Sequence, residues 1–157
     1  MSNALYDKGR EGFLAGDIDW DANTIKIMLI DEADDTIDLA TDDNLDDRAA
    51  VARVATSSAL GSKTVTNGVA DAADVTFSAV TGDPAESIDG FKDTGTESTS
   101  RLIFNIDTAT GLPVTPNGGE LPAAWGSGGA PLLKPWGGGP PHFPGDSAGS
   151  QGGGKGG

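Results

Sequence analysis

The stretch TIKIMLI, residues 24–30, decides the fold, because it is dense in β-branched and long apolar side chains and is short enough for one strand. Successive side chains of a strand point to opposite faces of the sheet. Here both faces are apolar, so the strand is expected to be covered on both sides. One face carries Ile25, Ile27 and Leu29, and the other carries Met28 and Ile30.

Further segments of the strand type follow at short spacing. KTVT (63–66) runs into Asn67-Gly68, a pair that favours a type I′ hairpin turn. Weaker strands are expected within 51–56, 86–92 and 120–125. The second of these contains Asp89 and Gly90, and both residue types are poor strand formers.

Two stronger segments show alternation and so predict which side chains share a face. DVTFSAV (74–80) is expected to present Val75, Phe77 and Ala79 together. RLIFNID (101–107) is expected to present Leu102, Phe104 and Ile106 together.

Many short strands separated by Gly, Pro and Asp turns predict an all-β fold, an antiparallel β-sandwich of jelly-roll-like form. We expect three parts. Residues 1–23 form an N-terminal arm or a short helix, which Gly9 and Gly12 would weaken, and residues 24–134 form the β-sandwich domain. Residues 135–157 form a flexible Gly/Pro-rich tail, since the last 32 residues hold 13 Gly and 5 Pro.

Composition limits the function. The chain has 24 acidic and 10 basic residues and a net charge of −14, which argues against nucleic-acid partners and anionic membranes. It has no cysteine, and its only histidine, His142, lies in a Gly/Pro-rich segment. We therefore expect no enzyme, no catalytic residue, no cofactor and no metal site, although the many carboxylates leave a glycosidase-type pair open to test.

The segment 31–47 holds nine acidic residues. Such density is compatible with calcium binding, because Ca²⁺ takes six to eight oxygen ligands. The alternative is a solvated acidic loop that keeps the protein soluble. Asp17, Asp19 and Asp21 resemble the start of a calcium loop, but the later ligand positions do not match, so Ile18 and Trp20 are expected to pack inside instead.

Several apolar side chains fall outside the predicted strands and are candidates for contact with a partner. They are Leu5, Tyr6, Phe13 and Leu14 near the N-terminus and Trp136 and Phe143 in the tail. If this is their role, deletion of residues 1–14 should weaken attachment to the partner while the β core still folds.

Several strings resemble a family of small structural proteins of tailed bacteriophages. They are LYDKGREGFLAGDIDWDANTIKIMLID (5–31), ARVATSSALGSKTVTNGVADAADVTF (52–77), KDTGTESTSRLI (92–103) and, most recognisably, GLPVTPNGG (111–119). The resemblance covers about residues 4–121. After Gly119 the chain departs from the family pattern and enters its Gly/Pro-rich tail.

The resemblance implies a capsid cement or decoration protein that binds and stabilises a shell of major capsid protein. It further implies a place on the capsid surface of the virion and self-association as a dimer or trimer. The alternative is a tail or neck component, such as a tube, adaptor or fibre-attachment protein. No catalytic residue follows from the resemblance.

Overall fold

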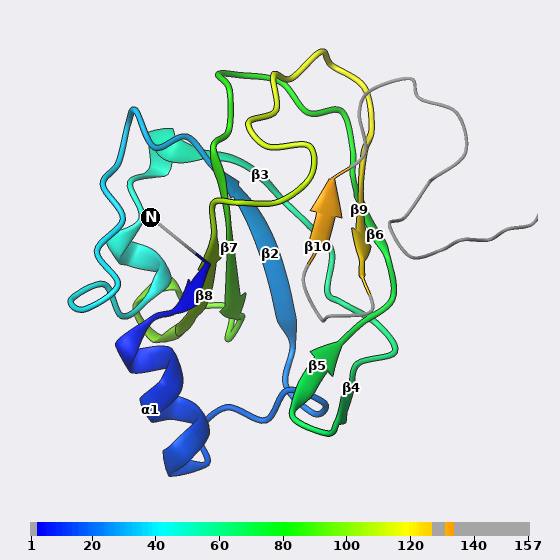
Figure 1. Ribbon diagram of the computed structural model, residues 1–157. Coiled ribbons are helices and arrows are strands. Elements are labelled where there is room, and N and C mark those ends of the chain that lie inside the picture. Colours follow the sequence, from blue (N-terminus) through cyan, green and yellow to red (C-terminus); the bar gives the residue numbers. More distant parts are fainter. Residues whose placement is uncertain (1–2, 127–130, 134–157) are drawn as a thin grey trace, which may run out of the picture.

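The protein is described by a computed structural model, in which residues 3–126 and 131–133 are placed. Strands dominate, and one helix lies near the N-terminus (Figure 1). The elements are β1 (Ala4–Leu5), α1 (Asp7–Ala15), β2 (Ile25–Ile30), β3 (Arg53–Thr56), β4 (Thr64–Thr66), β5 (Val69–Asp71), β6 (Val75–Phe77), β7 (Ser87–Lys92), β8 (Leu102–Ile106), β9 (Leu121–Trp125) and β10 (Pro131–Leu133), with 3₁₀ turns at Leu45–Asp47, Ala50–Ala52 and Glu97–Thr99.

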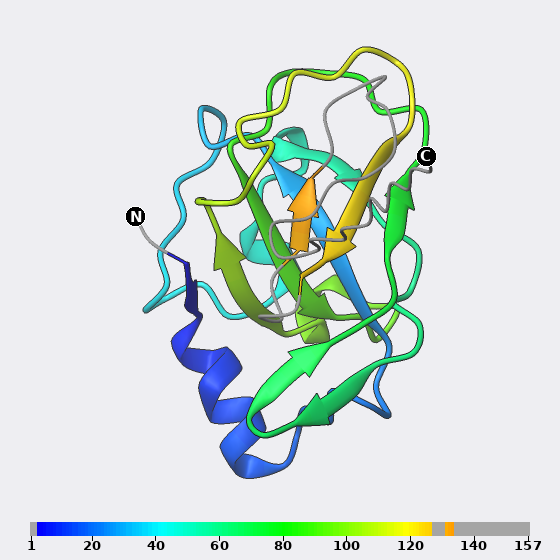
Figure 2. The ribbon, with the colours of Figure 1, turned by 45° about the vertical axis from the view of Figure 1, so that its right-hand side comes forward.

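The strands form an antiparallel β-sandwich, as expected from the sequence. One sheet has the order β1-β8-β7-β2-β3 and the other has the order β10-β9-β6 (Figures 1 and 2). The larger core lies between them, where Ile25, Ile27 and Leu29 of β2 meet Phe77 of β6 and Leu121 of β9. The jelly-roll connectivity stays a prediction.

A second core covers the other face of the five-stranded sheet. Met28 and Ile30 of β2 pack there with Tyr6 and Phe91, beneath the segment 31–52. The prediction that TIKIMLI is covered on both sides is therefore confirmed.

The segment around Asp89 and Gly90, where the sequence indicates only a weak strand, is the central strand β7, and its residues from Ser87 to Phe91 are buried. Gly90 leaves room for an aromatic ring of the neighbouring strand. A Cβ at that position would lie 2.2 Å from the ring of Phe104 on the neighbouring strand. Poor intrinsic strand propensity is thus overridden by tertiary contacts.

Two predicted faces are wrong, each because the backbone departs from regular alternation. In β8 the register shifts opposite Gly90 and Phe91, so Leu102 enters the second core while Ile106 enters the larger one. After β6, Ala79 has a φ of +50° and is exposed, and Val80 is buried in its place.

The N-terminal segment is part of the sandwich rather than a separate arm. β1 pairs with β8, and Ile18 and Trp20 are buried in the larger core, as expected for those two residues. The helix lies close against β8 because Gly9 has no side chain: a Cβ there would lie 2.5 Å from the carbonyl oxygen of Ile103. No helix among the described residues is long and apolar enough to cross a bilayer.

Candidate docking groove

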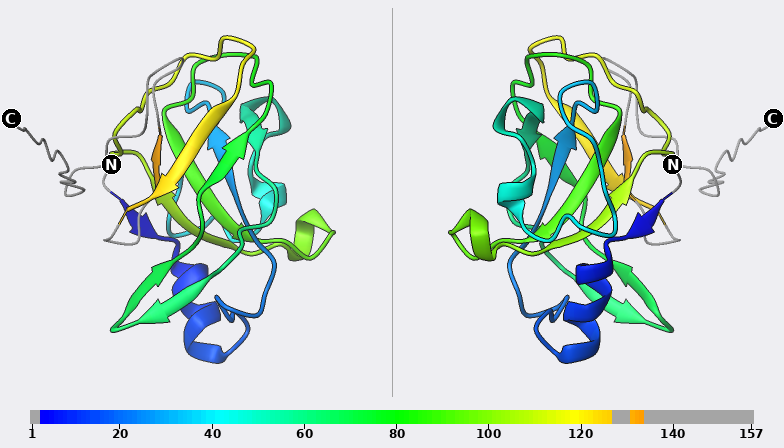
Figure 3. Two further views of the ribbon diagram at one scale, coloured as in Figure 1. Left: turned by 90° about the vertical axis from the view of Figure 1, so that its right-hand side faces the viewer. Right: turned by 90° about the vertical axis from the view of Figure 1, so that its left-hand side faces the viewer.

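An open apolar groove of about 740 Å³ lies between the N-terminal segment and the β4–β5 hairpin. Figures 2 and 3 show the hairpin projecting beside α1. The lining includes four aromatic side chains and two hairpin valines: Phe13 of α1, Trp20, Phe104, Trp125, Val65 and Val69.

The aromatic residues of the groove hold one another in place. The rings of Trp20 and Trp125 pack edge to face with centroids 5.7 Å apart, and Phe104 packs on Trp125 in the same manner at 6.4 Å. The indole Nε1 of Trp20 also donates a hydrogen bond to the carbonyl oxygen of Asp71, the last residue of β5 in the hairpin. These contacts make one side of the groove rigid.

The hairpin that forms the opposite side has the predicted turn. Asn67 and Gly68 have φ values of +52° and +80°, as a type I′ turn requires. Because the turn sets the pairing of β4 with β5, Thr66 faces Val69 across it. Val65 and Val69 are 54% and 38% exposed and both line the groove. They belong to neighbouring cross-strand pairs, Val65 with Ala70 and Val69 with Thr66, so their side chains leave opposite faces of the hairpin.

The structure brings together some of the predicted contact residues. Leu5 and Phe13 are each 36% exposed and line the groove. Leu14 is 89% exposed at the end of the same helix but does not line the groove. Trp136 and Phe143 lie outside the described residues.

The assignment of Tyr6 as a contact residue is wrong. Its side chain is fully buried in the second core. Tyr6 directly follows β1, whose pairing with β8 places it against the five-stranded sheet. Deletion of residues 1–14 would remove Tyr6 from the second core, so it does not separate partner contact from folding. Point substitutions at exposed positions are therefore the appropriate test of partner contact.

Beneath the acidic segment lies a buried polar cluster that includes Tyr6. The hydroxyl of Tyr6 donates a 2.8 Å hydrogen bond to Oδ1 of Asp89, and the amide nitrogen of Asn105 donates one of 2.9 Å to the same oxygen. Asn105 also donates to the hydroxyl of Ser87. All four side chains are fully buried, so the cluster holds the N-terminal segment to the central strands.

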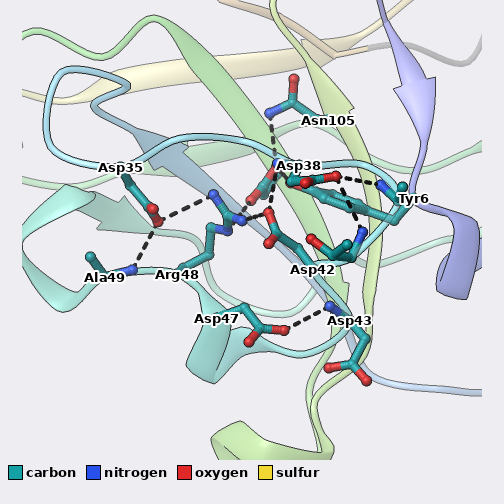
Figure 4. Close-up of polar contacts among 12 residues, drawn as sticks. Tyr6, Asp35, Asp38, Asp42, Asp43, Asp47, Arg48, Ala49 and Asn105 are labelled. Atoms are coloured by element: carbon teal, nitrogen blue, oxygen red, sulfur yellow. Dashed lines mark hydrogen bonds and ion pairs between the residues drawn. The ribbon is translucent and has the colours of Figure 1, made fainter.

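One buried cation, Arg48, connects the acidic segment to this cluster (Figure 4). Its guanidinium forms ion pairs with Asp35 at 3.2 Å, with Asp42, and with Asp89 at 3.6 Å. Asp35 also accepts a hydrogen bond from the backbone N–H of Ala49. The guanidinium side chain is 0% exposed, so these carboxylates compensate a charge that is removed from water.

Burial determines the titration of the cluster. Loss of solvation raises the pKa of Asp89 to about 6, although the hydrogen bonds from Asn105 and Tyr6 and the charge of Arg48 oppose the rise. Burial also raises the pKa of the Tyr6 hydroxyl, and the adjacent Asp89 carboxylate raises it further. Of the cluster residues Tyr6, Ser87, Asp89 and Asn105, Asn105 also belongs to the lining of the apolar groove.

Other acidic residues of the segment are used locally. A carboxylate oxygen of Asp47 accepts hydrogen bonds from the backbone N–H groups of Asp43 and Asn44, which lowers the pKa of Asp47. Burial and the neighbouring Asp47 carboxylate raise the pKa of Asp43. The idea of a purely solvated loop is thus too simple, because several of these carboxylates organise the backbone around Arg48.

A cluster of three aspartates is relevant to the prediction of calcium binding. Asp31, Asp34 and Asp83 each place a carboxylate oxygen within 4.8 Å of the others. Asp34 and Asp83 are exposed, and Oδ1 of Asp31 already accepts a hydrogen bond from the backbone of Ala33. Clustered surface acids of this kind do not by themselves define a metal site, and calcium binding stays a prediction.

Comparison with known proteins does not extend these observations. No protein-family model matches the chain, and no curated protein matches it significantly. The function is therefore inferred from the residues and geometry of the chain itself.

Proposed function

We propose that this chain is a virion structural protein of a tailed bacteriophage, a capsid cement or decoration protein that binds the shell of major capsid protein. The observation that carries the proposal is the apolar groove between α1 and the β4–β5 hairpin. Leu5 and Phe13, two of the residues that the sequence marks for partner contact, lie in it beside exposed hairpin valines. The resemblance of residues 4–121 to phage structural proteins supplies the class of partner.

The rest of the fold suits a mechanical role. The buried cluster around Asp89 ties the N-terminal segment to the central strands, so force applied at the groove is transmitted to the sandwich. A protein that strengthens a shell acts through many copies of a modest interface rather than through turnover. Self-association as a dimer or trimer remains part of the proposal.

Co-sedimentation tests the proposal directly. Expanded shells of the phage that encodes this chain, prepared without the protein, are mixed with the purified full chain and pelleted. We expect saturable binding in a fixed ratio to the major capsid protein, and greater resistance of the decorated shells to heat. Absence of binding to expanded shells would overturn the proposal.

Electron microscopy of the same particles separates the cement function from the tail or neck alternative. A cement protein should appear repeatedly over the whole capsid surface, following the capsid lattice. Density confined to a single vertex or to the tail would instead establish the alternative.

A further inference from the structure

The charge carried by the described lining of the apolar groove is negative. Among the described residues that line it, Asp19 is the only charged one. Asp17 is exposed and lies in the chain between Gly16 and Ile18, which both line the groove, and Asp71 follows Ala70 of β5, which also lines it. No lysine or arginine is among the described lining residues; Lys92 reaches the rim, where its Nζ donates to the backbone carbonyl of Asp17.

The C-terminal end of helix α1 adds to the negative electrostatic potential at the groove. The helix ends at Ala15, and Gly16 lines the groove. The carbonyl end of a helix carries partial negative charge, and basic side chains in the last turn usually offset it. The last turn of α1 contains none. The groove therefore combines apolar walls with a negative rim on the side of the N-terminal segment.

We propose that the groove receives a short apolar segment flanked by lysine or arginine, presented by the shell protein; this inference rests on the proposed function. The apolar centre of such a segment would cover Val65 and Phe13, and its basic ends would face the carboxylates of Asp17 and Asp19. Complementary charge then selects the partner and its orientation, while apolar contact provides most of the affinity.

Charge also disfavours a second copy of this chain as the occupant. The chain carries a net charge of −14, and a copy placed on the groove would bring a second acidic surface against Asp17 and Asp19. Like charges at short range oppose association. A nucleic acid is disfavoured for the same reason.

The first test uses three synthetic peptides and the full chain. The probe has a Leu-Phe-Val-Leu centre with two lysines at each end. One control peptide replaces the lysines by glutamates, and the other replaces the apolar centre by serines. Calorimetry should show binding of the probe at least about tenfold tighter than of either control, falling as salt is added. Equal binding of the lysine and glutamate peptides, or no binding of the probe, would overturn the inference.

Matched variants locate the site. Val65→Asp introduces a charge in the groove wall, whereas Val51→Asp does the same at a valine that is 73% exposed and lies outside the groove. We expect about a tenfold loss of probe binding for the first and no change for the second. Asp17→Lys provides a second variant at an exposed position; it should weaken the lysine probe and improve the glutamate control. Full probe binding by both Val65→Asp and Asp17→Lys would place the site elsewhere.

The same variants on expanded shells separate the two proposals. If wild type and Val65→Asp decorate shells equally, the groove inference fails while the cement function stands. If the probe binds in the groove but no variant or wild-type protein binds shells, the cement function fails while the chemistry of the groove stands.

Discussion

The hydroxyl of Tyr6 lies 2.8 Å from Oδ1 of Asp89 and donates a hydrogen bond to it, with both side chains fully buried. This contact joins the start of the chain to the central strand β7. Within the part of the chain that the structure describes, the carboxylate accepts one other hydrogen bond, from Asn105. Its solvation inside the protein therefore depends strongly on Tyr6.

Tyr6→Phe should lower the free energy of unfolding by about 1.5–3 kcal/mol, because a hydrogen bond to a buried carboxyl group is lost with little change in volume. It should also raise the pKa of Asp89 further, since the Tyr6 hydrogen bond opposes the effect of burial. Urea unfolding monitored by circular dichroism measures the first effect. A loss smaller than about 0.5 kcal/mol would show that the bond contributes little.

Gly9→Ala provides a second test, in which two effects have opposite signs. Alanine would favour an isolated helix by about 1 kcal/mol. In this protein the added Cβ would lie 2.5 Å from the carbonyl oxygen of Ile103, so α1 must move away from β8. We expect a net loss of about 1–3 kcal/mol in thermal or urea unfolding.

Gly61→Ala is the matched control, because a Cβ at Gly61 would meet no atom within 4 Å. That variant should be as stable as the wild type or slightly more stable. Stabilisation by Gly9→Ala would contradict the close approach of helix and sheet.

Asp89 should give the stability a distinctive dependence on pH. Its pKa is raised from 3.8 to about 6 in the folded protein. Between about pH 4 and pH 6 the folded state therefore retains a proton that the unfolded chain has released. The contribution of Asp89 is fully present below about pH 4 and is lost as pH rises through 6.

Asp89→Asn isolates this contribution, because asparagine does not titrate and can still accept hydrogen bonds from Tyr6 and Asn105. Relative to wild type, the variant should become more stable between pH 4 and pH 7 by up to about 3 kcal/mol. Urea unfolding at several pH values gives the difference directly. A difference between the two proteins that stays constant with pH would refute the assignment.

Arg48→Met removes the cation that Asp35, Asp42 and Asp89 share. We expect a loss of about 3–5 kcal/mol, since buried carboxylates are left without their partner. The double variant with Asp89→Asn should recover part of the loss. Arg10→Met is the matched control: its ion pair with Asp7 is exposed, so the change should stay below about 1 kcal/mol. Equal effects of Arg48→Met and Arg10→Met would refute the buried role of Arg48.

The sequence predicts the framework of the sandwich well, because apolar alternation and turn residues act locally. TIKIMLI has both faces apolar and is buried on both, and Asn67-Gly68 forms the expected hairpin turn. It fails where a distant contact overrides a local preference. Asp89 and Gly90 occupy a central strand because Arg48 pairs with the first and the ring of Phe104 fills the space beside the second.

Only some of the residues that line the groove can be identified from the sequence. Leu5 and Phe13 are identifiable as apolar residues outside the predicted strands, but Tyr6 has the same signature and is buried. The role of Val65 and Val69 depends on the hairpin projecting beside α1, which no local pattern encodes. Arg48 directly follows the segment 31–47 with its nine acidic residues, and this position is the sequence signal for a buried ion pair between the arginine and those carboxylates.

The five-stranded sheet separates two apolar cores, and its inner strands β2 and β7 are covered on both sides. Amide protons of these strands can reach solvent only when both layers open together, so their exchange with deuterium should require global unfolding. The β4–β5 hairpin pairs with no other described strand and should exchange through local opening. The hairpin side of the groove should therefore open readily, and a bound segment should slow exchange mainly in the hairpin.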